Sequence, residues 1–158
     1  MFKTPKWSGL SEVQTFIQSL NNAAGTFSQS KSRFGRQRAR SLLIRYAEQK
    51  GFCIVCKKFC FIPEHNSKLK NDARAHNRAT FDHVIPASKV RSNGLKNCVM
   101  MCSQCNNERG NIPYWMFRVL KWIHIPSYII KDLRKTYSNN SDISYTDRFY
   151  KNRYKKNK

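Results

Sequence analysis

Two short stretches decide the fold of this chain: residues 79–86, which read ATFDHVIP, and residues 102–111, which read CSQCNNERGN. The first contains an acid next to a histidine, and we expect a short strand over residues 80–85. The second begins with a cysteine pair and follows another expected strand over residues 98–101. Around them the chain is rich in Cys, His and Asn, and regular hydrophobic periodicity fades. A loop-rich centre of this kind needs a further source of stability.

Two CxxC pairs supply a candidate for that source. Cys102 and Cys105 form one pair, and Cys53 and Cys56 form the other. Each pair makes a tight turn that aims two thiolates at one point, and two such turns give the tetrahedral sulfur cage that zinc prefers in closed structural sites. Metal binding can then contribute folding free energy directly. We therefore predict a structural Zn²⁺ bound by these four cysteines. The alternatives are coincidental thiols or a redox pair.

Two further cysteines lie outside this pattern. A second metal site would have to combine Cys60 and Cys98 with His65 and His76, and the spacing of these residues is irregular. Cys98 lies in an expected strand, where a small buried hydrophobic role explains it more simply.

The charge of the chain points to a polyanionic partner. Lys and Arg together number 30 against nine acidic residues, which gives a formal net charge of +21. Each phosphate that binds such a surface releases counterions, so nucleic acid is the expected partner. No stretch reads as a basic amphipathic membrane anchor, and no apolar run approaches the ~18 residues of a membrane span. Residues 1–10 lack the apolar core of a signal peptide, so we expect a cytoplasmic, reducing environment.

Asp82 stands out because acids are rare in its neighbourhood. Between Asp72 and Asp132 the only acids are Asp82 and Glu108. Neighbouring residues on a strand point to opposite faces, so Asp82 and His83 should have different tasks. One can bind a metal ion while the other accepts a proton. For the histidine alone, a strand residue satisfied by hydrogen bonds would be the simpler reading.

Together these residues resemble the HNH endonuclease family in its zinc-containing ββα-metal form. The resemblance rests on the Asp-His pair at 82–83, on Asn97, and on the CxxCN motif at 102–106, and it extends over residues 36–111. It implies an α+β fold, with a ββα-metal core, a structural zinc, and flanking N- and C-terminal helices. It also implies a DNA endonuclease that leaves 5′-phosphate and 3′-hydroxyl ends.

The resemblance further implies a role for individual residues. His83 matches the general base, Asp82 and Asn106 match the ligands of a catalytic Mg²⁺ or Mn²⁺, and Asn97 matches the residue that holds the loop and orients the base. Arg109 matches a position that contacts DNA phosphate. The third family residue is often histidine. Asparagine is an accepted oxygen ligand at that place in junction-resolving phage endonucleases. A neutral histidine can accept a proton at physiological pH, and Mg²⁺ takes oxygen ligands while keeping several waters.

Helices are expected on both sides of this centre, and we divide the chain into residues 1–35, 36–115 and 116–158. A first helix, with a capping box at Ser11 and Gln14, ends near residue 22, and residues 23–32 read as a linker. A second helix covers residues 36–50, with a buried stripe made of Ala39, Leu42, Leu43 and Tyr46. Its arginines lie mostly off that stripe, so they either contact phosphate or form a solvated face. Arg36 and Arg40 are the nucleic-acid contacts that we predict.

Two more helices are expected over residues 114–124 and 127–137, separated by Pro126. Their apolar positions are predicted to be core residues: Trp115, Val119, Leu120, Ile123, Ile129, Ile130 and Leu133. The basic, aromatic tail over residues 138–158 suits either base stacking with phosphate contact or a solubilising role.

Two other functions fit part of this pattern. A non-catalytic zinc-ribbon DNA-binding protein would explain the charge and the CxxC pairs equally well, but it has no use for an acid and a base beside phosphates. RNA binding or cleavage is a weaker reading. The sequence does not determine whether the substrate is double-stranded or branched DNA, or whether the protein is a monomer or a homodimer.

Overall fold

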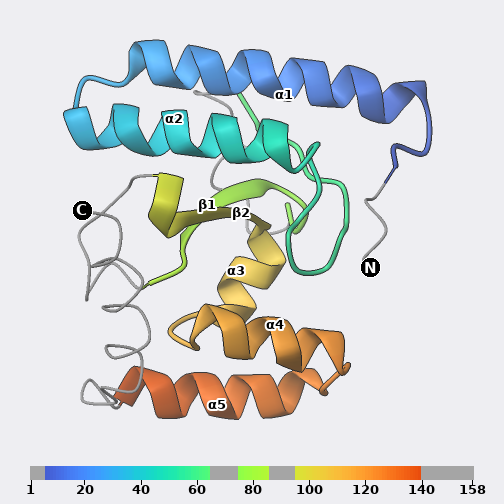
Figure 1. Ribbon diagram of the computed structural model, residues 1–158, viewed down its shortest axis with the longest axis vertical. Coiled ribbons are helices and arrows are strands. Elements are labelled where there is room, and N and C mark those ends of the chain that lie inside the picture. The colour runs from blue at the N-terminus through green and yellow to red at the C-terminus, as the bar shows by residue number, and fades with distance from the viewer. Residues whose placement is uncertain (1–5, 65–74, 86–94, 140–158) are drawn as a thin grey trace.

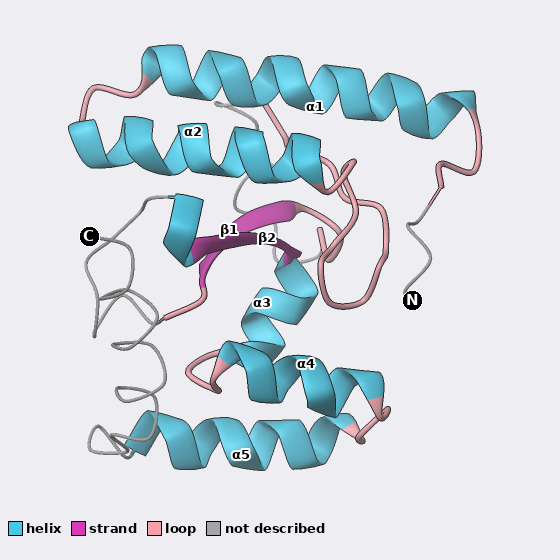
Figure 2. Cartoon of the chain, viewed as in Figure 1, coloured by secondary structure: helices cyan, strands magenta, loops and turns pink. Residues whose placement is uncertain are grey.

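A small β-hairpin lies between two groups of helices. The computed structural model describes residues 6–64, 75–85 and 95–139. In Figure 1, helices α1 (Leu10–Gln29) and α2 (Arg33–Glu48) lie side by side on one side of the hairpin, and α3 (Ser103–Arg109) lies on the other. Figure 2 shows how little of the chain is strand. The arrangement confirms the predicted α+β class, with a hairpin followed by a helix at its centre.

The hairpin consists of β1 (Ala79–His83) and β2 (Cys98–Cys102), which pair antiparallel. In this register Phe81 lies opposite Met100, and His83 lies opposite Cys98. A short 3-10 turn over Leu95–Asn97 precedes β2, and α3 follows β2 without a loop. The two predicted strands are thus confirmed, and a ββα unit places the acid, the histidine and the CxxCN motif together.

The first helix is longer than the sequence predicted. It runs unbroken to Gln29, so the expected helix end near residue 22 and the linker over residues 23–32 are wrong. The reason is tertiary contact with the distant residue Ile62. Ile62 N donates to Ser19 Oγ (2.9 Å), and Asn22 Nδ2 donates to Ile62 O (2.7 Å). These bonds and the buried Ala23 stabilise the helix through the stretch that its composition marked as a linker.

The start of α1 also differs from the prediction. Gly9 is the N-cap residue and makes no side-chain cap, so the capping box at Ser11 and Gln14 is wrong. Instead, the Glu12 carboxylate accepts the backbone N–H of Ser8 (2.6 Å). An acid in the first turn also suits the positive end of the helix dipole.

Helix α2 packs against α1 on one face and against the hairpin on another. Its predicted stripe is confirmed: Ala39 and Tyr46 are buried, and Leu42 and Leu43 pack against the core. The Tyr46 ring stacks on Phe16 of α1, and its hydroxyl donates to Cys60 O (2.7 Å). The helix begins at Arg33, capped by the Ser32 hydroxyl, three residues earlier than predicted.

The C-terminal helices are α4 (Tyr114–Trp122) and α5 (Ser127–Asn139), close to their predicted bounds. Ile130 is buried, and Leu120 and Leu133 pack against the core as expected. Trp115, Val119 and Ile123, however, are about half exposed, and Phe117 is the fully buried residue of α4. None of the described helices has the length and apolar character needed to cross a membrane.

Candidate functional site

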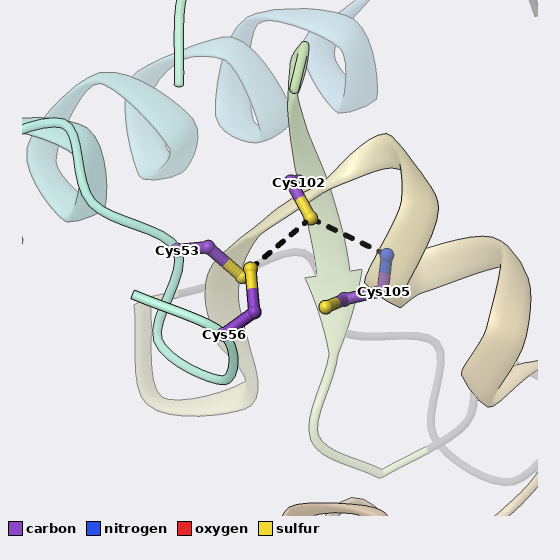
Figure 3. A group of neighbouring side chains, drawn as sticks. All are labelled: Cys53, Cys56, Cys102 and Cys105. Atoms are coloured by element: carbon purple, nitrogen blue, oxygen red, sulfur yellow. Dashed lines mark hydrogen bonds between the residues drawn. The ribbon is translucent and has the colours of Figure 1, made fainter. Parts of the chain in front are cut away.

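Four cysteine thiols gather where β2 meets α3. Figure 3 shows Cys53 and Cys56, from the loop after α2, facing Cys102 at the end of β2 and Cys105 in the first turn of α3. All four sulfur atoms lie within 4.8 Å of one another. A tetrahedral zinc site with ~2.3 Å bonds separates its sulfurs by about 3.8 Å, and Cys56 Sγ lies 3.7 Å from Cys102 Sγ. The cluster therefore fits the structural zinc that the spacing predicted.

The loop around the first cysteine pair is a tight turn. Phe52 and Phe59 form an antiparallel bridge, Cys53 N donates to Lys58 O (2.9 Å), and Lys57 N donates back to Cys53 O (3.1 Å). Lys57 adopts a left-handed conformation at the tip (φ 63°). The turn brings two thiols to one point, as the CxxC spacing requires.

Two of the four thiols favour the thiolate form even before a cation is considered, whereas the pKa of the other two, Cys102 and Cys105, is raised. Hydrogen bonds from the Cys102 and Cys105 thiols lower the pKa of Cys53, and they lower the pKa of Cys56 to about 7. Zinc binds thiolate rather than thiol, so this shared-proton arrangement suits a metal site.

The two remaining cysteines lie outside the cluster. Burial raises the pKa of both thiols, and they lie near backbone carbonyl oxygens: Cys60 Sγ near Lys58 O (3.5 Å) and Cys98 Sγ near Ser41 O (3.9 Å). Over the residues that the structure describes, the four-cysteine group is the only potential metal cluster of Cys, His and acidic side chains. His76 is exposed, and His65 lies outside the described residues.

Strand β1 presents different chemistry on its two faces. Phe81 and His83 share one face, and their rings meet edge to face with centroids 4.8 Å apart. Thr80 and Asp82 share the other face, which is turned toward α3 because both contact that helix. Asp82 and His83 thus lie on opposite faces of β1, as strand alternation predicts.

On the α3 side, Asp82 forms a buried ion pair with Arg109. Arg109 Nη1 donates to Oδ1 (2.7 Å) and Oδ2 (2.6 Å) of the carboxylate, and the two residues are 2% and 8% exposed. Burial raises the pKa of Asp82 above its usual value, and the charge of Arg109 opposes that rise. The carboxylate is thus held in place on a face that water reaches poorly.

Asn106 lies one helical turn before Arg109 and faces the same side of β1. Its amide nitrogen donates to Thr80 Oγ1 (3.1 Å), and Thr80 in turn donates to Met101 O (2.9 Å). Because the bond uses the amide nitrogen, the amide oxygen keeps its capacity to bind a hard cation. The structure therefore places Asp82 and Asn106, the two predicted oxygen ligands, on one face of the same strand.

Comparison with known protein families matches residues 53–111 to the HNH endonuclease family. We call this matched segment the HNH domain. The matched segment begins at the first cysteine of the zinc cluster and includes both strands and the whole of α3. Similarity to this family implies nuclease function and a DNA substrate. Neither the curated proteins nor the solved structures give a match to this chain.

Within the HNH domain, Asn97 fixes the backbone that leaves β1. Its side chain accepts from Ile85 N (2.8 Å) and donates to Ile85 O (3.1 Å), and its own carbonyl accepts from Val84 N (3.1 Å). Asn97 is 1% exposed. It ties the segment directly after the Asp-His pair to the start of β2.

Arg109 does not fit the phosphate contact predicted for it. Its guanidinium is buried against Asp82, and it also donates to Ile112 O (3.0 Å) and Val84 O (3.5 Å). A side chain with its donors used inside the protein cannot reach a DNA backbone without breaking these bonds. In this structure its guanidinium instead holds the Asp82 carboxylate.

The other predicted DNA contacts, Arg36 and Arg40, are exposed on α2. Arg36 Nη1 also donates to Ser30 O and Lys31 O (both 3.1 Å), where it braces the turn between α1 and α2. The sequence reading missed two residues near the centre, Thr80 and Arg38. Strand alternation places Thr80 on the face of Asp82, so that residue could have been found; Arg38 needed the packing of α2 on the hairpin.

Proposed function

We propose that this HNH domain is a DNA endonuclease in which His83 is the general base and Asp82 and Asn106 hold one divalent cation, Mg²⁺ or Mn²⁺. The observation that carries the proposal is the ββα unit itself. In this unit the Asp82 carboxylate and the Asn106 amide lie at one face of β1, and His83 directly follows Asp82 in the sequence. The chain as a whole is strongly basic.

The donor set suits a hard cation. A carboxylate offers about four lone-pair positions on its two oxygens, so Asp82 can keep its bond to Arg109 and still bind a metal ion. Mg²⁺ retains several water molecules when one or two protein oxygens bind it. When bound, the ion would supply charge stabilisation at the phosphate and at the leaving oxygen.

The protein side chains would perform the remaining steps. The imidazole of His83 accepts a proton from the attacking water as the water oxygen bonds to phosphorus. The bond between phosphorus and the 3′ oxygen breaks, and the leaving 3′ oxygen takes a proton from a solvent water molecule. The products are a 5′-phosphate and a 3′-hydroxyl end. The exposed arginines of α2, Arg36 and Arg40 among them, contribute sequence-independent attraction to the DNA backbone.

A supercoiled plasmid incubated with the protein and Mg²⁺ or Mn²⁺ tests this function. We expect nicked or linear products that disappear with EDTA, and we expect His83→Ala to abolish cleavage while DNA binding persists. His76→Ala, which changes an exposed histidine, is the matched control and should cut as the wild type does. Cleavage by His83→Ala at the wild-type rate would refute the general-base role. Binding without cleavage by the wild type would favour the zinc-ribbon DNA-binding alternative.

A further inference from the structure

Helix α2 carries arginines on two different faces. Residues three or four positions apart share a helix face. Arg33, Arg36 and Arg40 therefore share one face, and all three are exposed. Arg38 belongs to another row, which continues through Ser41 and Arg45.

The Arg38 row faces the hairpin. Arg45 donates to Cys98 O (3.0 Å) and to Leu95 O (2.6 Å), and the thiol of Cys98 lies near Ser41 O (3.9 Å). All three contacts lie at or just before the start of β2, and Cys98 there pairs with His83 at the end of β1. The same row therefore points Arg38 toward the histidine end of the hairpin.

Arg38 reaches the face of β1 that His83 occupies. Its guanidinium carbon lies 5.3 Å from the centroid of the Phe81 ring, and that ring meets the His83 imidazole edge to face. Guanidinium, phenyl ring and imidazole thus follow one another along one surface. Arg38 is exposed, whereas Phe81 beneath it is buried.

The charge of Arg38 is available to a ligand. In the part of the chain that the structure describes, no acidic side chain forms an ion pair with it, in contrast to Arg45 and Arg109. Stacking on an aromatic ring fixes the plane of a guanidinium and leaves its N–H groups at the edge, where they can bind phosphate in a fork. A cation held in this way beside a proposed general base suits an anion that is brought there to react.

We propose that Arg38 binds a backbone phosphate of the cleaved DNA strand, within one nucleotide of the scissile bond, on the side of β1 where His83 lies. This inference rests on the nuclease function proposed above. It differs from the sequence-based prediction, which assigned DNA contacts to Arg36 and Arg40 on the opposite face of the helix. A contact next to the reacting phosphate fixes the substrate's position, so its loss should lower the rate of cleavage more than the affinity.

The test compares Arg38→Ala with a matched control on another helix. Arg118 is an exposed arginine whose guanidinium lies 5.7 Å from the Tyr114 ring centroid, so Arg118→Ala removes the same charge and the same kind of stacking far along the chain from β1. We expect Arg38→Ala to lower kcat by about 10- to 100-fold with a much smaller change in Kd. Arg118→Ala should keep the wild-type kcat, and zinc content and melting temperature should be unchanged in both variants.

Synthetic DNA locates the phosphate. With a substrate whose cut site has been mapped, each phosphate flanking the scissile bond is replaced in turn by a neutral methylphosphonate. At one position the wild type should slow to the rate of Arg38→Ala, and Arg38→Ala should slow no further. Arg38→Lys, which keeps the charge but loses the planar fork, should recover part of kcat.

The outcomes separate this inference from the proposed function. If the wild type cuts and Arg38→Ala cuts equally well, or loses only affinity, the assignment of Arg38 is refuted and the nuclease function stands. Additive effects of Arg38→Ala and of every methylphosphonate would also refute it. If the wild type cuts no DNA at all, the proposed function fails and the role of Arg38 fails with it.

Discussion

Replacing Arg109 with alanine should cost the protein much of its stability, because the change leaves the Asp82 carboxylate buried without its partner. The two side chains are 3% and 10% exposed, and Arg109 Nη1 contacts both carboxylate oxygens. Removing one member of a buried ion pair typically costs about 3–5 kcal/mol. For a chain of this size that corresponds to a fall in melting temperature of about 6–20 °C.

A second ion pair of the same helix gives the control. Glu108 of α3 accepts from Lys121 Nζ (2.7 Å), but its side chain is 22% exposed and that of Lys121 is 25% exposed. Partly solvated pairs of this kind contribute about 1 kcal/mol or less, so Lys121→Ala should melt close to the wild type. Thermal unfolding of both variants, with zinc present in excess, measures the contrast. Equal melting temperatures for Arg109→Ala and Lys121→Ala would refute the reasoning.

The loss of stability caused by Arg109→Ala should also depend on pH. Burial already raises the pKa of Asp82 in the wild type, and removal of the arginine takes away the charge that opposes this rise. An acid whose pKa is higher in the folded than in the unfolded state loses stability as pH rises between the two values. The gap between variant and wild type should therefore be largest near neutral pH and shrink as the solution is acidified. The double variant Asp82→Leu with Arg109→Met, which buries neither charge, should be more stable than Arg109→Ala.

Two further predictions concern the zinc cluster and the strand beside it. Cys53→Ser should lose zinc and unfold the centre of the chain. Cys98→Ser, which changes a buried cysteine outside the cluster, should keep its zinc. Metal content and melting curves measure both effects, and unchanged zinc content and melting of Cys53→Ser would contradict the assignment. Thr80→Val keeps the side-chain shape but removes the oxygen that accepts from Asn106, so the Mg²⁺ concentration for half-maximal cleavage should rise by about 10-fold or more. An unchanged Mg²⁺ dependence would show that Thr80 does not orient Asn106.

The central ββα unit was predictable because its signals are local. The CxxC spacing depends on one turn of chain, and the opposite orientation of Asp82 and His83 follows from strand alternation alone. The four-cysteine cluster and both strands therefore came from short-range patterns, whereas the helix after β2 and its contact with β1 were implied by the resemblance to the HNH family. What these patterns lack is information about partners far away in the sequence.

The helix errors show that missing information. The end of α1 depends on two hydrogen bonds with Ile62, some forty residues away: Ser19 accepts from its N–H, and Asn22 donates to its carbonyl. A polar, Gly-containing composition was therefore misleading. Helix α4 carries two apolar stripes, one with Phe117 and one with Trp115 and Val119, and periodicity cannot say which faces inward. The burial of Arg109 was equally hidden, because only the fold brings it to Asp82.

The zinc cluster and the proposed catalytic centre depend on each other through α3. Cys102 ends β2, and its sulfur also accepts the backbone N–H of Cys105 (3.3 Å), which caps the helix. Cys105 is followed directly by Asn106, so a metal ion bound by both cysteines would fix where α3 starts and how it is rotated. An α-helix turns by about 100° per residue. A shift of one residue at the cluster would therefore swing Asn106 away from Thr80 and Arg109 away from Asp82. A zinc ion that touches no substrate would thus control the geometry of cleavage.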